Sequence, residues 1–121
     1  VVVIDPDRAG RLKLATEAYD RKVAGIISGA KGLSPGMVMK ATGAPMADGE
    51  HPVALTGRVW CYCDASTAGI GLGDMLTTSG TPGHAMRAAD LPRAQGAIIG
   101  KAMSALARGE RGLVLVLVNL Q

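Results

Sequence analysis

The chain has 121 residues, of which 48% are hydrophobic and 17 are glycine, and it contains no Phe, one Trp and two Tyr. Its length fits a single domain, and we predict one β domain over residues 1–121 with a core of Val, Leu, Ile, Ala and Met. The net charge of +3 is scattered and aromatic side chains are few, which argues against nucleic-acid binding. No stretch approaches the ~20 apolar residues of a membrane-spanning helix, which argues against membrane insertion.

The first residues, Val1–Ile4, read as a short strand with two apolar faces. They include no initiator Met and no signal-peptide pattern, so we expect the C-terminal part of a longer protein or a product of processing. A turn at Asp5–Gly10 and the alternation of residues 11–14 predict a hairpin with the first strand. The segment Thr16–Lys22 suits one helical turn, with Thr16 as its N-cap.

The next part of the chain is broken by glycines. Val23–Ala30 reads as a buried strand, Lys31–Gly36 as a loop and Met37–Met39 as a short strand. Ala41–His51 is rich in Gly, Pro and Ala, and this composition predicts a mobile surface loop.

The longest strand candidate is Pro52–Asp64, where side chains alternate between two faces. The face predicted to point to the core holds Val53, Leu55, Gly57, Val59, Cys61 and Cys63. The opposite face holds Ala54, Thr56, Arg58, Trp60 and Tyr62. The large amphipathic rings of the second set would cover a sheet edge or an interface.

The second half of the chain continues with short strands and turns. In chain order we expect a loop at Ser66–Gly73, a strand at Asp74–Thr78, a turn at Ser79–Gly83, a returning strand at His84–Ala88, a short turn at Asp90–Pro92, a strand at Ala97–Met103 and a polar turn at Arg108–Gly112.

These segments amount to about eight or nine short strands at regular spacing, which favours an all-β fold, a small barrel or a sandwich. A parallel α/β sheet would need crossover helices of about ten or more residues. The best helix candidate, Lys101–Arg108, is shorter than that.

The terminal strand, Leu113–Leu120, has apolar side chains on both faces. A strand of a two-layer antiparallel fold normally shows one polar face, so a monomer would leave part of this strand in water. Val1–Ile4 has the same character. We therefore predict a homo-oligomer with its terminal strands at or near the interface.

Two glycine-containing segments resemble phosphate loops only superficially. Gly69–Gly73 has its third glycine too early for a dinucleotide fingerprint and precedes a strand. Gly100–Lys101–Ala102 lacks the earlier glycine, since position 95 is Gln95, and Ala102 replaces the magnesium-binding hydroxyl. No cofactor-binding residue is predicted.

Metal binding would have to recruit Cys61, Cys63, His51 and His84, but the spacing matches no zinc site, and small buried cysteines are the favoured interpretation. Nucleophilic catalysis needs a nucleophile, a base and an orienting group. The candidate nucleophiles are Ser28, Ser34, Thr56, Cys61, Cys63 and Ser79, and the candidate bases are His51 and His84. No pairing follows from the sequence, and Asp5, Asp7, Asp64 and Asp74 are expected to be turn residues. No catalytic residue is assigned and the chain is not predicted to be an enzyme.

Several blocks together carry a resemblance that covers most of the chain. They are Thr16–Asp20, Val23–Ala30, Pro52–Val59, Gly73–Met86, Gly96–Met103 and Gly112–Gln121. In these blocks the chain resembles the β-rich C-terminal modules of phage tail or neck-appendage fibres and related bacterial proteins.

The resemblance implies a trimeric assembly or capping module of a virion or extracellular fibre. Some modules of this kind are intramolecular chaperones that release themselves by autoproteolysis, so single-turnover self-cleavage is the alternative function. A third interpretation is a carbohydrate- or surface-binding module built on Trp60 and Tyr62.

Overall fold

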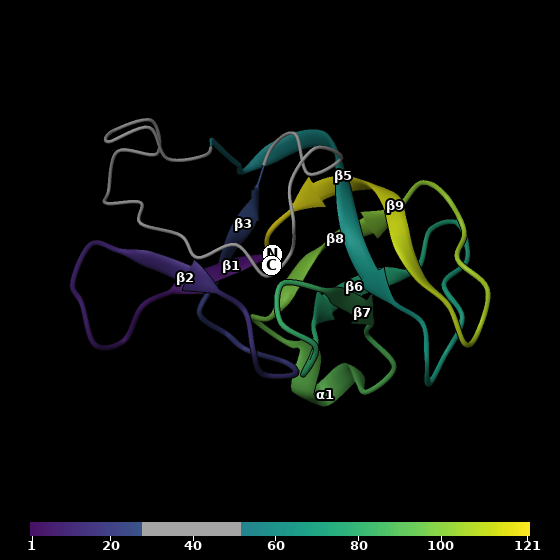
Figure 1. The fold of residues 1–121 in the computed structure, drawn as a ribbon, viewed down its shortest axis with the longest axis horizontal. Helices are drawn as coiled ribbons and strands as arrows, with labels where there is room; N and C mark the ends of the chain where they lie inside the picture. The colour runs from purple at the N-terminus through teal and green to yellow at the C-terminus, as the bar shows by residue number, and fades with distance from the viewer. Residues whose placement is uncertain (28–51) are drawn as a thin grey trace.

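The computed structural model describes residues 1–27 and 52–121. Within these residues it contains the strands β1 (Val2–Ile4), β2 (Leu12–Leu14), β3 (Val23–Ile27), β4 (Val53–Ala54), β5 (Thr56–Asp64), β6 (Met75–Thr78), β7 (Ala85–Arg87), β8 (Ile98–Ala102) and β9 (Arg111–Asn119), and one helical turn, α1 (Leu91–Ala94). The predicted all-β class is confirmed (Figure 1). The elements expected at Lys31–Gly36, Met37–Met39 and Ala41–His51 lie outside the described residues.

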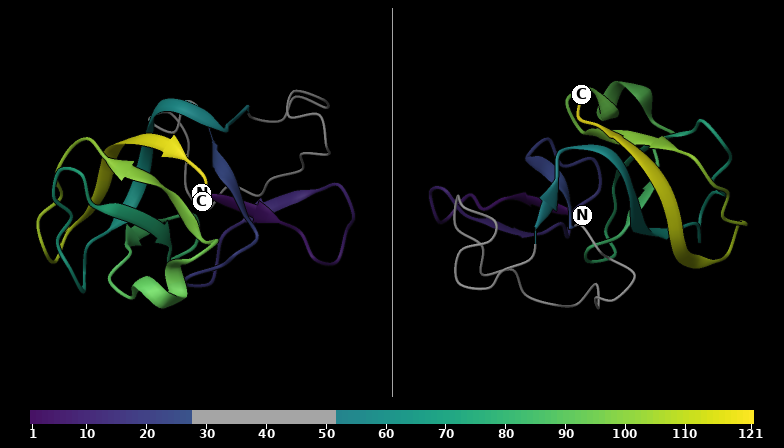
Figure 2. Two further views of the ribbon diagram at one scale, coloured as in Figure 1. Left: turned by 180° about the vertical axis from the view of Figure 1, so that it is seen from behind. Right: turned by 90° about the horizontal axis from the view of Figure 1, so that it is seen from above.

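The strands form a four-stranded sheet and a closed barrel (Figures 1 and 2). The sheet has the order β2-β1-β3-β4, and the barrel has the order β5-β7-β6-β8-β9. The barrel is built on the long antiparallel pair of β5 and β9, which runs from Thr56 opposite Asn119 to Asp64 opposite Arg111. It closes through a short parallel contact in which Cys63 of β5 lies opposite Ala85 of β7. Closure leaves the barrel without an open edge.

One aliphatic core joins the sheet to the barrel. Val1, Val3 and Ile26 face the barrel from the sheet, and they belong to the same buried cluster as the interior residues of β5 and β9. Those interior residues are Val59, Cys61, Cys63, Val114, Val116 and Val118. The core is therefore built mainly from small aliphatic side chains, as predicted.

Strand β1 is covered on both faces by its own chain. Val1 and Val3 lie in the principal core, while Val2 and Ile27 form a second cluster on the other face of the sheet. The expectation that Val1–Ile4 needs a neighbouring subunit is therefore wrong for its three valines, because a sheet layer in the same chain buries them. Ile4 is different, since it is 51% exposed.

The predicted strand Pro52–Asp64 is divided between the two sheets. Ala54 packs on the principal core from β4, and Val59 does so from β5, so the inward-facing parity changes between them. The change coincides with the break at Leu55 and with Gly57, whose φ of 85° is left-handed. Leu55, predicted to face the core, is consequently 62% exposed.

The segment Thr16–Lys22 contains no helical turn, in contrast to the prediction. Tyr19 adopts a left-handed φ of 55°, and its N–H donates to the carbonyl of Thr78 at 3.2 Å. The N–H of Asp20 donates to the hydroxyl of Thr78 at 2.7 Å. These hydrogen bonds to β6 satisfy the two main-chain N–H groups in place of helical hydrogen bonds. The segment therefore runs along the barrel without forming a helix.

The remaining connections are short. The turn expected at Asp90 forms α1, where the Asp90 carboxylate accepts the N–H of Arg93. The helix candidate Lys101–Arg108 is not helical, because its first two residues belong to β8 and Leu106 forms a β-bridge with Ile70. In the part of the chain that the structure describes, no helix has the length and apolarity needed to cross a membrane.

Candidate functional site

The turn between β6 and β7, residues 79–84, contains two of the candidate catalytic residues, Ser79 and His84. The hydroxyl of Ser79 donates to the main-chain oxygen of His84 at 2.8 Å. The hydroxyl of Thr81 donates to the carboxylate of Asp64, at the end of β5, at 2.5 Å. The role of Thr81 could not be read from the sequence, because its partner is 17 residues away.

The imidazole of His84 is part of the same turn and is 8% exposed. Its Nδ1 lies 2.9 Å from the carbonyl oxygen of Pro82, and because a carbonyl can only accept, Nδ1–H is the donor of this hydrogen bond. The ring packs against Tyr62 with centroids 5.7 Å apart. The hydroxyl of Ser79 is directed to main-chain oxygens and not to this ring, so the two residues form no nucleophile–base pair.

The other candidates for nucleophilic catalysis do not join this turn. Thr56 lies at the opposite end of β5, seven residues from Cys63, which corresponds to about 23 Å along a strand. Ser28, Ser34 and His51 lie outside the described residues. Self-cleavage therefore remains a prediction, because the described residues contain no nucleophile paired with a base.

Asp64 is a buried carboxylate with several partners. The N–H of Ser66 donates to Oδ1 at 2.8 Å, Thr81 donates to Oδ2, and Arg111 Nε lies 3.4 Å from Oδ2. The hydrogen bonds from Ser66 and Thr81, together with the positive charge of Arg111, lower the pKa of Asp64 to about 2. The carboxylate is therefore ionised at neutral pH and holds the turn against the barrel, so Asp64 is more than a local turn residue.

The same turn connects the barrel to the four-stranded sheet. The main-chain nitrogen of Val1 donates to the carbonyl of Gly83 at 2.9 Å, and the N–H of Gly83 donates to Ala15 at 2.8 Å. The Thr81–Asp64 hydrogen bond and these main-chain bonds thus make residues 79–84 a structural junction, because they tie the turn to β5 and to residues 1 and 15.

The two cysteines are buried side by side on the inner face of β5. Cys61 and Cys63 are both free thiols with 0% exposure, and Cys61 Sγ lies 3.3 Å from the carbonyl of Tyr62. The hydrogen bond with Cys61, followed by burial, raises the pKa of the Cys63 thiol. Thiols that solvent and reagents cannot reach are poor nucleophiles and poor metal ligands. No cluster of three or more His, Cys, Asp or Glu residues suited to a metal occurs within the described ranges.

The glycine segments have structural roles. In the loop before β6, the N–H of Gly71 donates to Asp74 Oδ2 at 2.8 Å, so this loop closes on its own carboxylate. Gly100 lies within β8, where an added Cβ would collide with the carbonyl oxygen of Leu117. Its lack of a side chain permits the close approach of β8 and β9 and is unrelated to phosphate binding.

A surface hollow of about 350 Å³ lies beside β6 and β7. Its lining includes Asp74, Met75, Arg87 and Leu91, and Arg87 Nε lies 3.7 Å from Asp74 Oδ2. Both side chains of this ion pair are partly solvated, and Leu91 is 57% exposed. The hollow has no arrangement of groups that defines a reaction.

The outer surface of the β5–β9 pair is the most distinctive feature of the molecule. Trp60 lies opposite Leu115 and Tyr62 opposite Leu113 in the register of the two strands. Directly opposed residues of an antiparallel pair project on one face. The N–H of Met103 donates to Leu115 at 2.7 Å, which places Met103 beside this row. We define the outer apolar face as Trp60, Tyr62, Met103, Leu113, Leu115 and Leu117.

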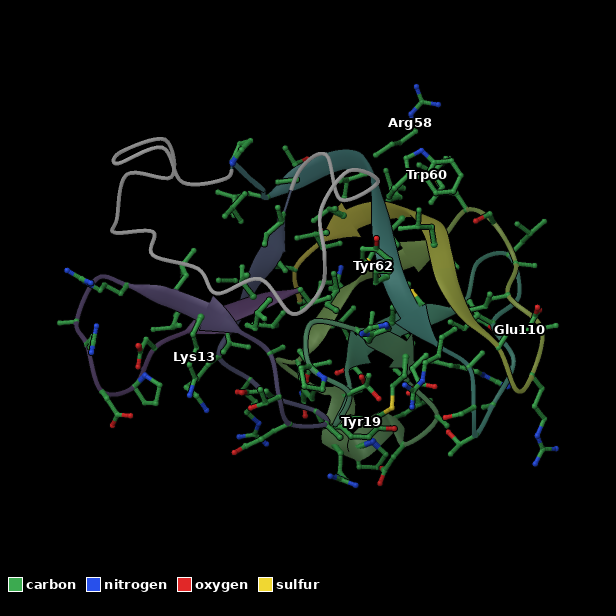
Figure 3. The ribbon with its side chains drawn as sticks, viewed as in Figure 1. Lys13, Tyr19, Arg58, Trp60, Tyr62 and Glu110 are labelled. Carbon is green, nitrogen blue, oxygen red and sulfur yellow. The ribbon has the colours of Figure 1, made fainter. Side chains whose placement is uncertain are left out.

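Much of this face is accessible to solvent. Trp60 is 36% exposed, Met103 40% and Leu117 45%, whereas the alternate residues of β9, which include Val114 and Val116, are fully buried. Figure 3 shows Trp60 directed away from the body of the barrel. The terminal strand thus has one face in the core and one apolar face outside it, as the sequence predicts for an isolated chain.

Comparison with known proteins identifies no relative: no protein-family profile, no curated protein and no solved structure matches the chain.

Proposed function

We propose that the chain is a structural assembly module whose outer apolar face packs against further copies of itself in a homotrimer. The observation that carries this proposal is the row Leu113, Leu115 and Leu117, which alternates with core valines and faces outward beside Trp60 and Tyr62. Burial of the area that remains exposed would contribute on the order of 1 kcal/mol for each of the larger side chains. Contiguous exposed apolar side chains of this kind mark interaction surfaces.

Two further considerations support assembly over catalysis. The hydroxyl of Ser79 and the carboxylate of Asp64 are engaged in holding the turn 79–84, and the thiols are inaccessible. The number three, and a place at the C-terminal end of a virion or extracellular fibre, rest on the resemblance of the chain to phage fibre modules.

The test is the molar mass in solution, measured by light scattering during size-exclusion chromatography. We expect three chains per particle for the unmodified protein and one chain for Leu115→Lys, since a buried lysine opposite Trp60 would lose its hydration. Leu72→Lys is the matched control, because Leu72 is 73% exposed in the loop before β6. It should remain trimeric. A stable monomer of the unmodified protein at micromolar concentration would contradict the proposal.

The same face supports a second candidate function, carbohydrate binding, because Trp60 and Tyr62 project on one side of β5. Stacking on sugar rings would quench or shift the fluorescence of Trp60. Titration of the protein with oligosaccharides, followed by that emission, distinguishes this function from assembly: an unchanged spectrum at every sugar concentration argues for assembly alone.

A further inference from the structure

The barrel closes beside its two thiols. Strands β5 and β9 pair along their whole length, whereas β5 and β7 pair at one position in the described residues, Cys63 opposite Ala85 (Figure 1). We refer to this pairing as the seam. Because a ladder is stabilised by the number of its pairs, the barrel is held closed most weakly at a residue that carries a thiol.

The two thiols are placed to react with each other. Cys61 and Cys63 are free, fully buried on the inner face of β5 and hydrogen-bonded to one another. Two residues along a strand correspond to a Cα separation of about 6.4–6.8 Å, at the upper limit of the ~4.4–6.8 Å that a disulfide spans. A disulfide at the usual separation of ~5.5–6 Å therefore requires β5 to shorten by about 1 Å at Tyr62.

Such a shortening conflicts with the pairings of the closed barrel. Tyr62 lies opposite Leu113 in the uninterrupted ladder with β9, and Cys63 lies opposite Ala85 at the seam. The ladder with β9 retains its register through a local bend, because it continues to Thr56. The seam has no neighbouring pair to restore its register once Cys63 is displaced. It is therefore the contact that a disulfide between the two cysteines breaks.

We propose that Cys61 and Cys63 form a redox-sensitive latch: the two thiols belong to the closed barrel, and a Cys61–Cys63 disulfide, formed by exchange with a low-molecular-weight disulfide, opens the seam. In this exchange the two S–H bonds and the S–S bond of the small disulfide break, and one S–S bond forms in the protein. The protein loses two electrons and two protons, which leave in two molecules of the small thiol. The latch lies on the inner face of β5 and is independent of the proposed assembly through the outer one.

Closure of the barrel and formation of the disulfide oppose each other. If the disulfide favours the open seam, closure of the barrel must favour the two thiols by the same factor. Because the thiols are buried, exchange takes place only in molecules whose seam has opened, and oxidation of the folded protein is slow.

The first test is the oxidation equilibrium of the unmodified 121-residue chain in mixtures of reduced and oxidised glutathione, with and without urea. Mass spectrometry after acid quenching measures the fraction of molecules that has lost two hydrogen atoms. We expect the disulfide to form in both conditions, with an equilibrium constant at least tenfold smaller without urea. Equal constants, or no disulfide without urea at any glutathione ratio, would overturn the latch.

Hydrogen exchange of the oxidised protein locates the opening. We expect the main-chain amides at the seam, residues 62–64 and 85, to exchange at least tenfold faster than in the reduced protein. The pair of β1 and β2 in the other sheet is the internal control and should change by less than about twofold. Unchanged exchange at the seam would show that the disulfide fits the closed barrel, which contradicts the proposal.

Cys61→Ala is the matched control for the reagent, because it keeps Cys63 and the seam but cannot form the bridge. The same glutathione mixtures should leave amide exchange at its seam within about twofold of the untreated variant. Exchange that accelerates in this variant as much as in the unmodified protein would show that the bridge is not what opens the seam.

Discussion

The hydroxyl of Thr81 donates to Oδ2 of Asp64 at 2.5 Å and so ties the turn 79–84 to the end of β5. The same carboxylate lies 3.4 Å from Arg111 at the start of β9. Three segments far apart in the sequence therefore meet at one buried acid. Because Arg111 is 61% exposed, its ion pair is screened by solvent, and the hydrogen bonds from Ser66 and Thr81 contribute more.

The stability of the protein should depend on the ionisation of Asp64. Its folded-state pKa is about 2, below the ordinary value of 3.8. A lowered folded-state pKa stabilises the fold fully above the ordinary value, and this stabilisation is lost as the pH falls from about 4 through about 2. We expect the free energy of unfolding to fall by up to about 2 kcal/mol across this window. Urea unfolding at several pH values measures it, and Asp64→Asn should have a shallower pH dependence. An identical dependence in both proteins would contradict this prediction.

Removal of the Thr81 hydroxyl tests the same junction at neutral pH. Thr81→Val leaves Oδ2 of a buried carboxylate without its closest donor and should cost about 1–3 kcal/mol of unfolding free energy. Thr67→Val is the matched control, because Thr67 is exposed in the following loop, and it should change the stability by less than about 0.5 kcal/mol. Equal effects of the two substitutions in denaturant unfolding would show that the junction does not stabilise the fold.

The close approach of β8 and β9 predicts a strong effect of a single methyl group. In Gly100→Ala the new Cβ would meet the main-chain oxygen of Leu117, and backbone cannot yield as a flexible side chain can. We expect a loss of about 1–3 kcal/mol as the barrel strands separate. Gly80→Ala is the control, because its Cβ would meet nothing within 4 Å. Thermal unfolding of the two variants should differ by several degrees, and equal midpoints would argue against the barrel packing.

The buried thiols should be protected in the folded protein. Cys61 and Cys63 have no exposed surface, and the pKa of Cys63 is raised by its hydrogen bond with Cys61 and by burial. We expect an aromatic disulfide reagent to modify both thiols together, at a rate limited by opening of the barrel, and to react rapidly after addition of denaturant. Rapid modification of either thiol without denaturant would show that β5 opens locally, which the closed barrel does not predict.

Trp60 provides a reporter of the assembly, because it is the only tryptophan in the chain. In one copy its side chain is 36% exposed, and in the proposed trimer it becomes less accessible to water. We therefore expect the emission maximum to move to longer wavelength as the protein is diluted, in parallel with the loss of mass by sedimentation. Met103→Lys should give the long-wavelength emission at all concentrations. Emission that does not change while the particle dissociates would place the interface elsewhere.

Apolar runs, side-chain alternation and turn residues were together sufficient to locate most of the strands. The hairpin of residues 1–14 follows from the alternation of residues 11–14 and its turn, and the strands that contain Met75–Thr78 and Ile98–Ala102 and the terminal strand follow from apolar runs between turn residues. Alternation also implies that the valines of the terminal strand share one face and its leucines the other, but both faces are apolar, so only the structure shows that the valines point inward.

The failures of the sequence-based predictions have physical causes that lie outside the local pattern. Thr16–Lys22 has the composition of a helical turn, but hydrogen bonds to Thr78 of a distant strand determine its path. Side chains of Pro52–Asp64 alternate between two faces on either side of Leu55. At Leu55 the chain crosses from one sheet to the other, so the inward-facing positions change from even-numbered to odd-numbered residues. Neither event depends on neighbouring residues alone.

The sequence by itself thus determined the all-β class, the positions of the strands and the two apolar faces of the last one, because these are properties of contiguous residues. Only the tertiary structure decided that β5, β7, β6, β8 and β9 close into a barrel and that β1 is covered by its own sheet. It alone placed Asp64, Thr81 and Arg111 together, and Leu117 between Arg58 and Lys101. Such pairings join residues far apart in the chain, and their stability comes from packing that no local pattern encodes.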